Sequence, residues 1–295
     1  MNGAAGEKSR GTAAGLAAIL IWSSTAAIVV SAPGVDPFLY IGIGHLIGFG
    51  LFLLKWLGQQ YNPWPELRRV PLWYLAAGLT GIAVHELTWV AALQQAPPME
   101  ATLIIYLWPL LVVVFTTLAL GQRLGWAHGL GCICGLVGLV VMFIGRGVEL
   151  DEISLQAGHG FAALCALSWA LYSAMSAREK QLGTNVLGAI FLISGCLNLI
   201  YWYGALRAPP APAHSLLVVI LSAIPLYGAY MLWDYAMKYG DCQLVGMSSF
   251  LTPVLAALCL VAIGAASPTP YLIGSLALVM LGIGFAKYGH MLAKT

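Results

Sequence analysis

Charged residues are scarce in this sequence. Asp, Glu, Lys and Arg make up 8% of its 295 residues, whereas 60% of the residues are hydrophobic. A soluble domain carries about 25% charged residues, so this composition cannot cover a surface that faces water. Several apolar runs extend for about 20 residues, the length that the hydrocarbon core of a bilayer requires of a helix. The sequence therefore predicts a helical protein that crosses a membrane many times.

Several functional motifs are missing as well. No G-x-x-x-x-G-K-[ST] segment is present, so ATP is not the energy source of this polypeptide. No basic patch with interleaved aromatic residues is present, which excludes nucleic acid as a partner. HELTW (85–89) lacks the second histidine of the H-E-x-x-H zinc signature, because residue 89 is tryptophan. No metal or other cofactor is expected. A membrane-embedded enzyme using His85 and Glu86 is a remote alternative, since no nucleophile or second ligand accompanies them.

Apolar segments bounded by proline, glycine and charge predict ten spans. Their expected ranges are 12–31, 37–57, 71–94, 98–119, 125–145, 157–177, 184–204, 214–237, 241–263 and 270–292. Lys and Arg collect in cytoplasmic loops. With the N-terminus inside, 11 of the 13 Lys and Arg residues lie on the cytoplasmic side, and only Arg146 and Arg207 lie outside. Both termini are therefore expected in the cytoplasm.

The chain also contains an internal repeat. A shift of 144 residues places Trp89 on Trp233 and Pro109 on Pro253, and a shift of 145 aligns GLAAILIWS (15–23) with GFAALCALS (160–168). The expected organisation is a tail (1–11), a five-span half (12–145), an extracytoplasmic linker (146–156) and a second half (157–292). Because five is odd, the second half must insert upside down. Inverted repeats suit alternating access around a site near the membrane midplane.

The segments that carry the repeat resemble a known family. ILIWSS (19–24), AALQQAPPMEATLIIYLWPLL (91–111) and SSFLTPVLAAL (248–258) look like the EamA domains of the drug/metabolite transporter superfamily. Within it, YLWP (106–109), GQRL (121–124) and SWALYSAMSAREK (168–180) are most similar to the bacterial YddG-type exporters of aromatic amino acids. The resemblance implies a ten-helix exporter of the bacterial inner membrane with a central cavity.

Glu86 lies just past the centre of the third predicted span. An ionised carboxylate there costs about 2.5–3.5 kcal/mol on insertion scales, and no Lys or Arg is expected in the membrane core to offset it. Glu86 must therefore be protonated, paired with a histidine, or facing a wet cavity. It either binds a substrate ammonium group or a proton, or it is a neutral acid hydrogen-bonded between helices. His85 and His45 remain open between interhelical contacts and a cavity role.

Aromatic residues predict the lining of a cavity. Trp22, Trp108 and Trp169 fall near the middle of their spans, far from the interfacial belts where Trp and Tyr usually collect. An indole N–H in hydrocarbon needs a partner, so these rings are expected to face the bundle interior. Asp234 is expected at the cytoplasmic interface. The predicted substrate-binding residues are Glu86, His85, Trp22, Trp89, Trp108, Trp169, Tyr106, Tyr172, Tyr230 and Ser23.

Three further residues are candidates for movement. Pro109 and Pro253 lie near the middle of the fourth and ninth spans, and each bends its helix. The bends either curve the helices around a cavity or act as hinges. Glu100, in the first turn of the fourth span, either complements the helix dipole or takes part in gating at the outer mouth.

The leading hypothesis is a secondary transporter that exports aromatic or other neutral amino acids. Phosphorylated substrates would need Arg or Lys in the cavity, which the sequence does not predict. An efflux carrier for aromatic or quaternary cations is the alternative, and a structural or sensory membrane protein is the third. The expected partners are a small-molecule substrate and the lipid bilayer, with protons as a further candidate. A monomer or a weak dimer is expected.

Overall fold

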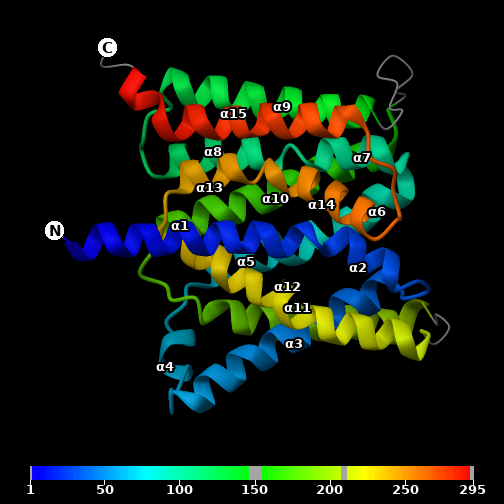
Figure 1. Cartoon of the computed structure of the whole chain (residues 1–295). Helices are drawn as coiled ribbons and strands as arrows, with labels where there is room; N and C mark the ends of the chain where they lie inside the picture. The colour runs from blue at the N-terminus through cyan, green and yellow to red at the C-terminus, as the bar shows by residue number, and fades with distance from the viewer. Residues whose placement is uncertain (1, 146–154, 207–210, 293–295) are drawn as a thin grey trace.

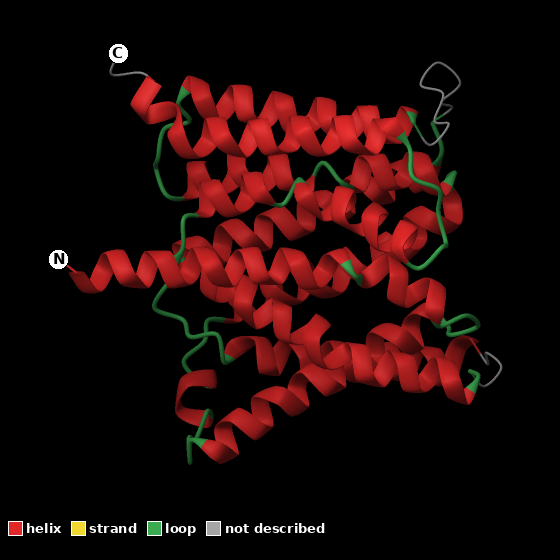
Figure 2. Cartoon of the chain, viewed as in Figure 1, coloured by secondary structure: helices red, strands yellow, loops and turns green. Residues whose placement is uncertain are grey.

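The computed structural model describes residues 2–145, 155–206 and 211–292, and all regular secondary structure in these ranges is helical (Figure 2). Ten segments are long and apolar enough to cross a membrane, which confirms the predicted number of spans. The elements are α1 (Asn2–Ser23), α2 (Thr25–Ser31), α3 (Pro37–Gly58), α4 (Trp64–Leu67), α5 (Leu72–Leu79), η1 (Thr80–Val84), α6 (His85–Gln95), α7 (Pro98–Ile105), α8 (Trp108–Ala119), α9 (Trp126–Ile144), α10 (Ala157–Arg178), α11 (Val186–Tyr201), η2 (Trp202–Leu206), α12 (Ala213–Tyr239), α13 (Cys242–Ser248), α14 (Leu251–Ala262) and α15 (Pro270–Leu292).

Most predicted boundaries agree with the helices to within two residues. The fourth span is Pro98–Ala119, as predicted, because Pro97 precedes it, Pro98 begins it and Gly121 adopts a positive φ of 62° after it. The N-terminal segment is more helical than expected, since α1 begins at Asn2 and includes most of the predicted tail. Arg146, Arg207 and most of the 146–156 linker lie outside the described residues.

The fourth and ninth spans are each broken near the middle. α7 gives way to α8 at Tyr106 and Leu107, and α13 gives way to α14 at Ser249 and Phe250. Pro109 and Pro253 follow these breaks by a residue or two. A proline lacks an N–H and clashes with the carbonyl four residues before it, so the helix cannot continue unchanged through that position. The breaks therefore fall at equivalent positions of the two sequence repeats.

The helices lie side by side, and segments from the two parts of the chain alternate (Figure 1). α1 packs on α12, α3 on α11, α9 on α15, and α10 on both α6 and α8. The backbones of α9 and α15 approach each other closely, since a Cβ on Gly131 would lie 2.7 Å from the carbonyl oxygen of Gly282. Each of these pairs joins a helix before residue 145 to one after residue 156. The core is therefore a seam between the two sequence repeats.

Candidate functional site

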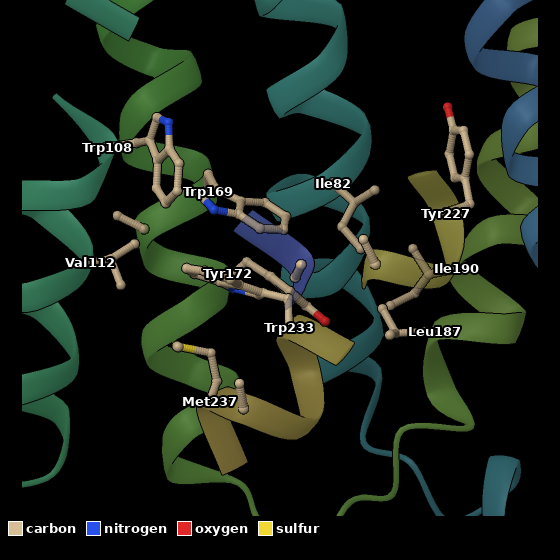
Figure 3. Close-up of a cluster of buried hydrophobic side chains, with 14 of the residues drawn as sticks. Ile82, Trp108, Val112, Trp169, Tyr172, Leu187, Ile190, Tyr227, Trp233 and Met237 are labelled. Carbon is tan, nitrogen blue, oxygen red and sulfur yellow. The ribbon is translucent and has the colours of Figure 1, made fainter. Parts of the chain in front are cut away.

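Aromatic rings from four helices meet in the interior of the bundle. The ring centroids of Trp22 on α1 and Trp169 on α10 are 5.5 Å apart, and Tyr230 on α12 lies 5.2 Å from Trp22 and 5.5 Å from Trp169. Trp233 on α12 lies 5.7 Å from both Trp169 and Trp108 on α8. Figure 3 shows Trp108, Trp169 and Trp233 converging from these helices. The three tryptophans predicted at mid-span thus belong to one cluster.

Two indole N–H groups of this cluster have interhelical partners. Trp22 Nε1 donates to the carbonyl oxygen of Leu226 over 3.2 Å, and Trp233 Nε1 donates to Ser173 Oγ over 3.1 Å. These bonds satisfy polar atoms that would otherwise be costly inside a membrane protein. They also fix the planes of two rings, so the cluster presents a defined aromatic surface.

Glu86 lies beside this cluster and is 8% exposed. The hydroxyl of Tyr230 donates to Glu86 Oε1 over 3.0 Å, and His45 Nε2 lies 3.3 Å from Glu86 Oε2. His45 on α3 is fully buried, with its ring 5.0 Å from that of Tyr227. The histidine nearest to Glu86 is thus the distant His45 and not the neighbouring His85, and the two side chains are in contact without a hydrogen bond of good geometry.

The backbone beside Glu86 is unusual. Residues Thr80–Val84 form one π-helical turn between α5 and α6, and Glu86 follows two residues later. A π-helical turn inserts an extra residue per turn and rotates the helix that follows. It therefore decides which face of α6 turns toward α3 and α12.

His85 points to a different neighbour. Its Nδ1 lies 3.0 Å from the carbonyl oxygen of Cys165, and its ring centroid is 5.3 Å from that of Trp169. The side chain is half-buried, as are Trp22 and Tyr230, whereas Trp169 and Trp233 are buried. His85 therefore joins α6 to α10 and contributes to the more accessible part of the ring cluster.

The remaining predicted binding residues divide into two groups. Tyr172 joins the cluster, with its ring 5.5 Å from that of Trp169. Tyr106 instead contacts Phe143 at 6.5 Å, and Ser23 donates to the carbonyl oxygen of Ile19 in its own helix over 2.7 Å. Trp89 is half-buried and packs against the main hydrophobic core. Among the described residues, it takes part in none of the ring contacts given above.

Asp234, expected at the cytoplasmic interface, is buried between helices. Asp234 and Lys238 are each 1% exposed, and Lys238 Nζ lies 2.8 Å from Asp234 Oδ2. Ser176 and Tyr172 on α10 donate to Asp234 Oδ1 over 2.6 and 3.2 Å. Lys238 therefore lies in the protein interior, one residue before Tyr239, the last residue of α12. An ion pair with added hydrogen bonds compensates both charges, which lets them lie in the interior.

A polar contact between helices lies at each end of the bundle. At one end His159 Nε2 of α10 is 3.0 Å from Glu100 Oε2 of α7, and the backbone N–H of Gln156 donates to His159 Nδ1 over 2.9 Å. At the other end Lys8 of α1 is 2.8 Å from Asp241, the N-cap of α13. Sequence reasoning missed His159; its place in the first turn of the sixth span was the available signal.

The electrostatics of Asp241 reflect this partnership. Partial burial raises the pKa of the Asp241 carboxyl, but the hydrogen bond from Lys8 and the backbone N–H of Leu244 outweigh burial. The pKa therefore lies below the ordinary value for aspartate, and the ionised form is favoured.

Comparison with known proteins assigns this arrangement to a family. The model of the EamA-like transporter family matches residues 9–144 and again residues 156–287. The chain belongs to this family. It is 34% identical to the aromatic amino acid exporter YddG of Ancylobacter novellus over 97% of this chain and 99% of that protein. It is 26% identical to the aromatic amino acid exporter YddG of Escherichia coli, over 84% and 86% of the two chains.

A solved crystal structure has the same fold as this EamA-family protein. The two superpose with a TM-score of 0.86 at 32% sequence identity, over 98% of this chain and all of the other. Within the present chain, the candidate site draws on both matched segments. Trp22, His45 and Glu86 come from residues 9–144, and Trp169 and Tyr230 come from residues 156–287. The site therefore requires both EamA units.

Proposed function

We propose that this protein exports aromatic amino acids across the bacterial inner membrane by alternating access. The observation that carries the proposal is the convergence of an aromatic cluster and one carboxylate, Glu86, between the two EamA units. Aromatic faces suit the side chain of phenylalanine, tyrosine or tryptophan. The carboxylate suits the ammonium group. Two relatives, both aromatic amino acid exporters, support the same substrate class.

The half-buried side chains define the surface that the substrate contacts first. Trp22, Tyr230, His85 and Trp89 retain exposed area, and Glu86 Oε1 accepts the Tyr230 hydroxyl among them. The substrate ring packs against Trp22 and Trp169, and its ammonium group replaces the His45 contact on Glu86. Tyr230 keeps the carboxylate oriented during this exchange.

An inverted repeat places this site where both halves can use it. Glu86 and Tyr230 are separated by 144 residues, the shift that aligns the two halves, and they are hydrogen-bonded. Two equivalent residues of a symmetric pair touch only near the symmetry axis. The start of α1 and the end of α15 also lie at one end of the bundle, with the start of α10 at the other (Figure 1). With the positive residues of the loops, this favours cytoplasmic termini.

Movement centres on the broken spans and on the polar contacts at the two ends of the bundle. Pro109 and Pro253 act as hinges at the α7–α8 and α13–α14 breaks. The Glu100–His159 pair closes the outer end, and the Lys8–Asp241 pair closes the cytoplasmic end. Each gate opens in turn while the other remains paired, which is the minimum that alternating access requires. Protons are a candidate counter-substrate, because Glu86 must find another partner after the ammonium group leaves.

A carrier for aromatic cations is the second candidate. Glu86 has no lysine or arginine contact among the described residues, and aromatic rings surround it, as a quaternary ammonium group would require. This candidate shares the transport cycle with the first. The two candidates differ in the substrate, because an aromatic cation has no carboxylate.

The deciding experiment is uptake of labelled phenylalanine by proteoliposomes that contain the purified protein, with and without an imposed pH gradient. We expect saturable uptake that unlabelled tyrosine and tryptophan inhibit more strongly than phenyltrimethylammonium does. Uptake driven uphill by the gradient identifies proton coupling, and indifference to the gradient identifies a facilitator. Absence of phenylalanine uptake alongside uptake of phenyltrimethylammonium contradicts the first function and supports the second.

A further inference from the structure

The Asp234–Lys238 ion pair has no role in the site described so far. The two residues stand one turn apart on α12, and Asp234 also accepts hydrogen bonds from Ser176 and Tyr172 on α10. Neighbouring side chains are apolar and buried, including Trp233, which is 0% exposed. The pair is thus a closed polar cluster at the packed seam between α10 and α12.

Fold stability does not account for this pair. Removing two charges from water costs about as much as their attraction returns, and apolar residues of similar volume often serve as well. Ionisable groups inside membrane spans usually mark substrate or ion pathways. Lys238 also has unused capacity. Its ammonium carries three N–H donors, and among the described residues Asp234 is its one hydrogen-bond acceptor.

The pair lies on the same helix that supplies Tyr230 to the Glu86 site. Tyr230, Asp234 and Lys238 occupy one face of α12 at intervals of four residues, so Asp234 and Lys238 lie roughly 6 and 12 Å beyond Tyr230 along the axis. The direction is toward Gly240 and Asp241, the end of the bundle at which α1 begins. Tyr172 connects the two places, since it touches Trp169 and Asp234, and Figure 3 shows it beside Trp233.

We propose that Asp234 and Lys238 form a second binding station, specific for zwitterions, that the substrate visits before it reaches Glu86. The inference rests on the proposed function, because it requires an aromatic amino acid to enter from the end where α1 begins. The substrate carboxylate contacts Lys238, and its ammonium group contacts Asp234. Two intermolecular ion pairs then replace the internal one, and the substrate ring lies against Trp233.

Charge balance makes this station selective. A zwitterion leaves every buried charge with an opposite partner before, during and after the exchange. An aromatic amine would leave Lys238 unpaired, and an aromatic acid would leave Asp234 unpaired. An unpaired buried charge is strongly unfavourable. The station therefore rejects both classes, whereas Glu86 alone would accept the amine as readily as the amino acid.

Ligand-induced thermal stabilisation of the purified full chain tests the proposal. The probes are phenylalanine, phenethylamine and 3-phenylpropionate, which carry both charges, only the ammonium, and only the carboxylate. The double variant Asp234→Asn/Lys238→Met removes both charges, so that no unpaired charge remains in the interior. Asp36→Asn/Lys287→Met makes the same two substitutions away from this seam.

We expect the unmodified protein and the control to bind phenylalanine at least about tenfold more tightly than phenethylamine, and the neutral variant to lose most of this preference. An unchanged preference in the folded neutral variant overturns the proposal. Equal binding of phenylalanine and phenethylamine by the unmodified protein overturns it without any variant. The exchanged variant Asp234→Lys/Lys238→Asp keeps both charges, and it should retain a preference for phenylalanine; its loss there also counts against the station.

Transport measured in parallel separates this proposal from the proposed function. Zwitterion-selective binding that depends on Asp234 and Lys238, without phenylalanine transport, contradicts the function and supports the station. Normal phenylalanine transport by the neutral variant, with unchanged selectivity, supports the function and contradicts the station.

Discussion

Glu86 and Asp234 are two buried acids on corresponding spans, the third of each half, and their surroundings differ. Asp234 has a lysine one turn away and two hydroxyl donors from α10. Glu86 has one tyrosine hydroxyl and a histidine at 3.3 Å. Asp234 is compensated by a permanent cation, and Glu86 is not. A carboxylate without a permanent partner is the one that can accept a substrate ammonium group, and for this reason we propose substrate binding for Glu86 and charge exchange for Asp234.

The largest expected effect comes from breaking the compensated pair. Asp234→Asn alone leaves the Lys238 ammonium buried without a carboxylate, which should lower the free energy of unfolding by about 3–5 kcal/mol. Unfolding of the purified protein by sodium dodecyl sulfate in mixed micelles measures this change. Asp234→Asn/Lys238→Met should regain most of the loss. A single variant as stable as the parent would show that Lys238 is not held by Asp234.

Glu86→Gln should remove function while preserving the fold. The amide keeps the shape of the side chain and still accepts the Tyr230 hydroxyl, but it cannot attract an ammonium group. We expect phenylalanine uptake into proteoliposomes to fall at least tenfold, about 1.4 kcal/mol of lost interaction, with little change in unfolding free energy. Glu7→Gln, the same substitution at an exposed position of α1, is the control. Full activity of Glu86→Gln would remove Glu86 from the binding site.

Tyr230→Phe should have a smaller effect. It deletes one hydrogen bond to Glu86 and keeps the ring that contacts Trp22 and Trp169. A net hydrogen bond contributes about 0.5–1.5 kcal/mol, so phenylalanine affinity should fall by roughly 2- to 13-fold. Concentration-dependent uptake measures it. The ring of Tyr227 stacks on that of Tyr230 at 5.6 Å, but the Glu86 hydrogen bond comes from Tyr230. Tyr227→Phe is therefore the control and should retain the parental affinity.

The exposed Lys8–Asp241 pair should have the smallest effect. Lys8→Met is expected to change the free energy of unfolding by no more than about 1 kcal/mol, because water screens exposed pairs. The folded-state pKa of Asp241 is lowered, so its stabilising contribution is present above the ordinary aspartate pKa and is lost as the pH falls through the lower, folded value. Thermal unfolding is measured between about pH 3 and pH 6, a range that includes the ordinary pKa of aspartate. The unfolding temperature should depend less on acid in Lys8→Met than in Lys287→Met. Equal curves would contradict a role for the pair.

The spans could be predicted from the sequence because a helix that crosses a bilayer needs a continuous apolar run, and proline, glycine or charged residues mark its ends. The segment 98–119 has both, and its helix bounds agree with the prediction. The convergence of Trp22, Trp108 and Trp169 was also readable, since a mid-span indole must avoid lipid. The Glu86–Tyr230 contact had a signal that could have been used: the repeat shift of 144 places one residue on the other.

Other contacts left no signal in the sequence. His45 and Glu86 lie on different helices, and nothing in their spacing indicates that a π-helical turn at Thr80–Val84 precedes Glu86. Asp234 and Lys238 have the spacing of an ordinary surface pair on one helix. Only the packing of α10 against α12 shows that this face is buried.

The sequence by itself determined the membrane class, the ten spans and the residue types available for a site, because these depend on hydrophobicity and periodicity along one chain. The tertiary structure decided which acid has a permanent cation and which has only a histidine. That choice depends on the rotation of each helix against its neighbours, through the π-helical turn and the seam between α10 and α12, and neighbouring helices come from distant parts of the chain.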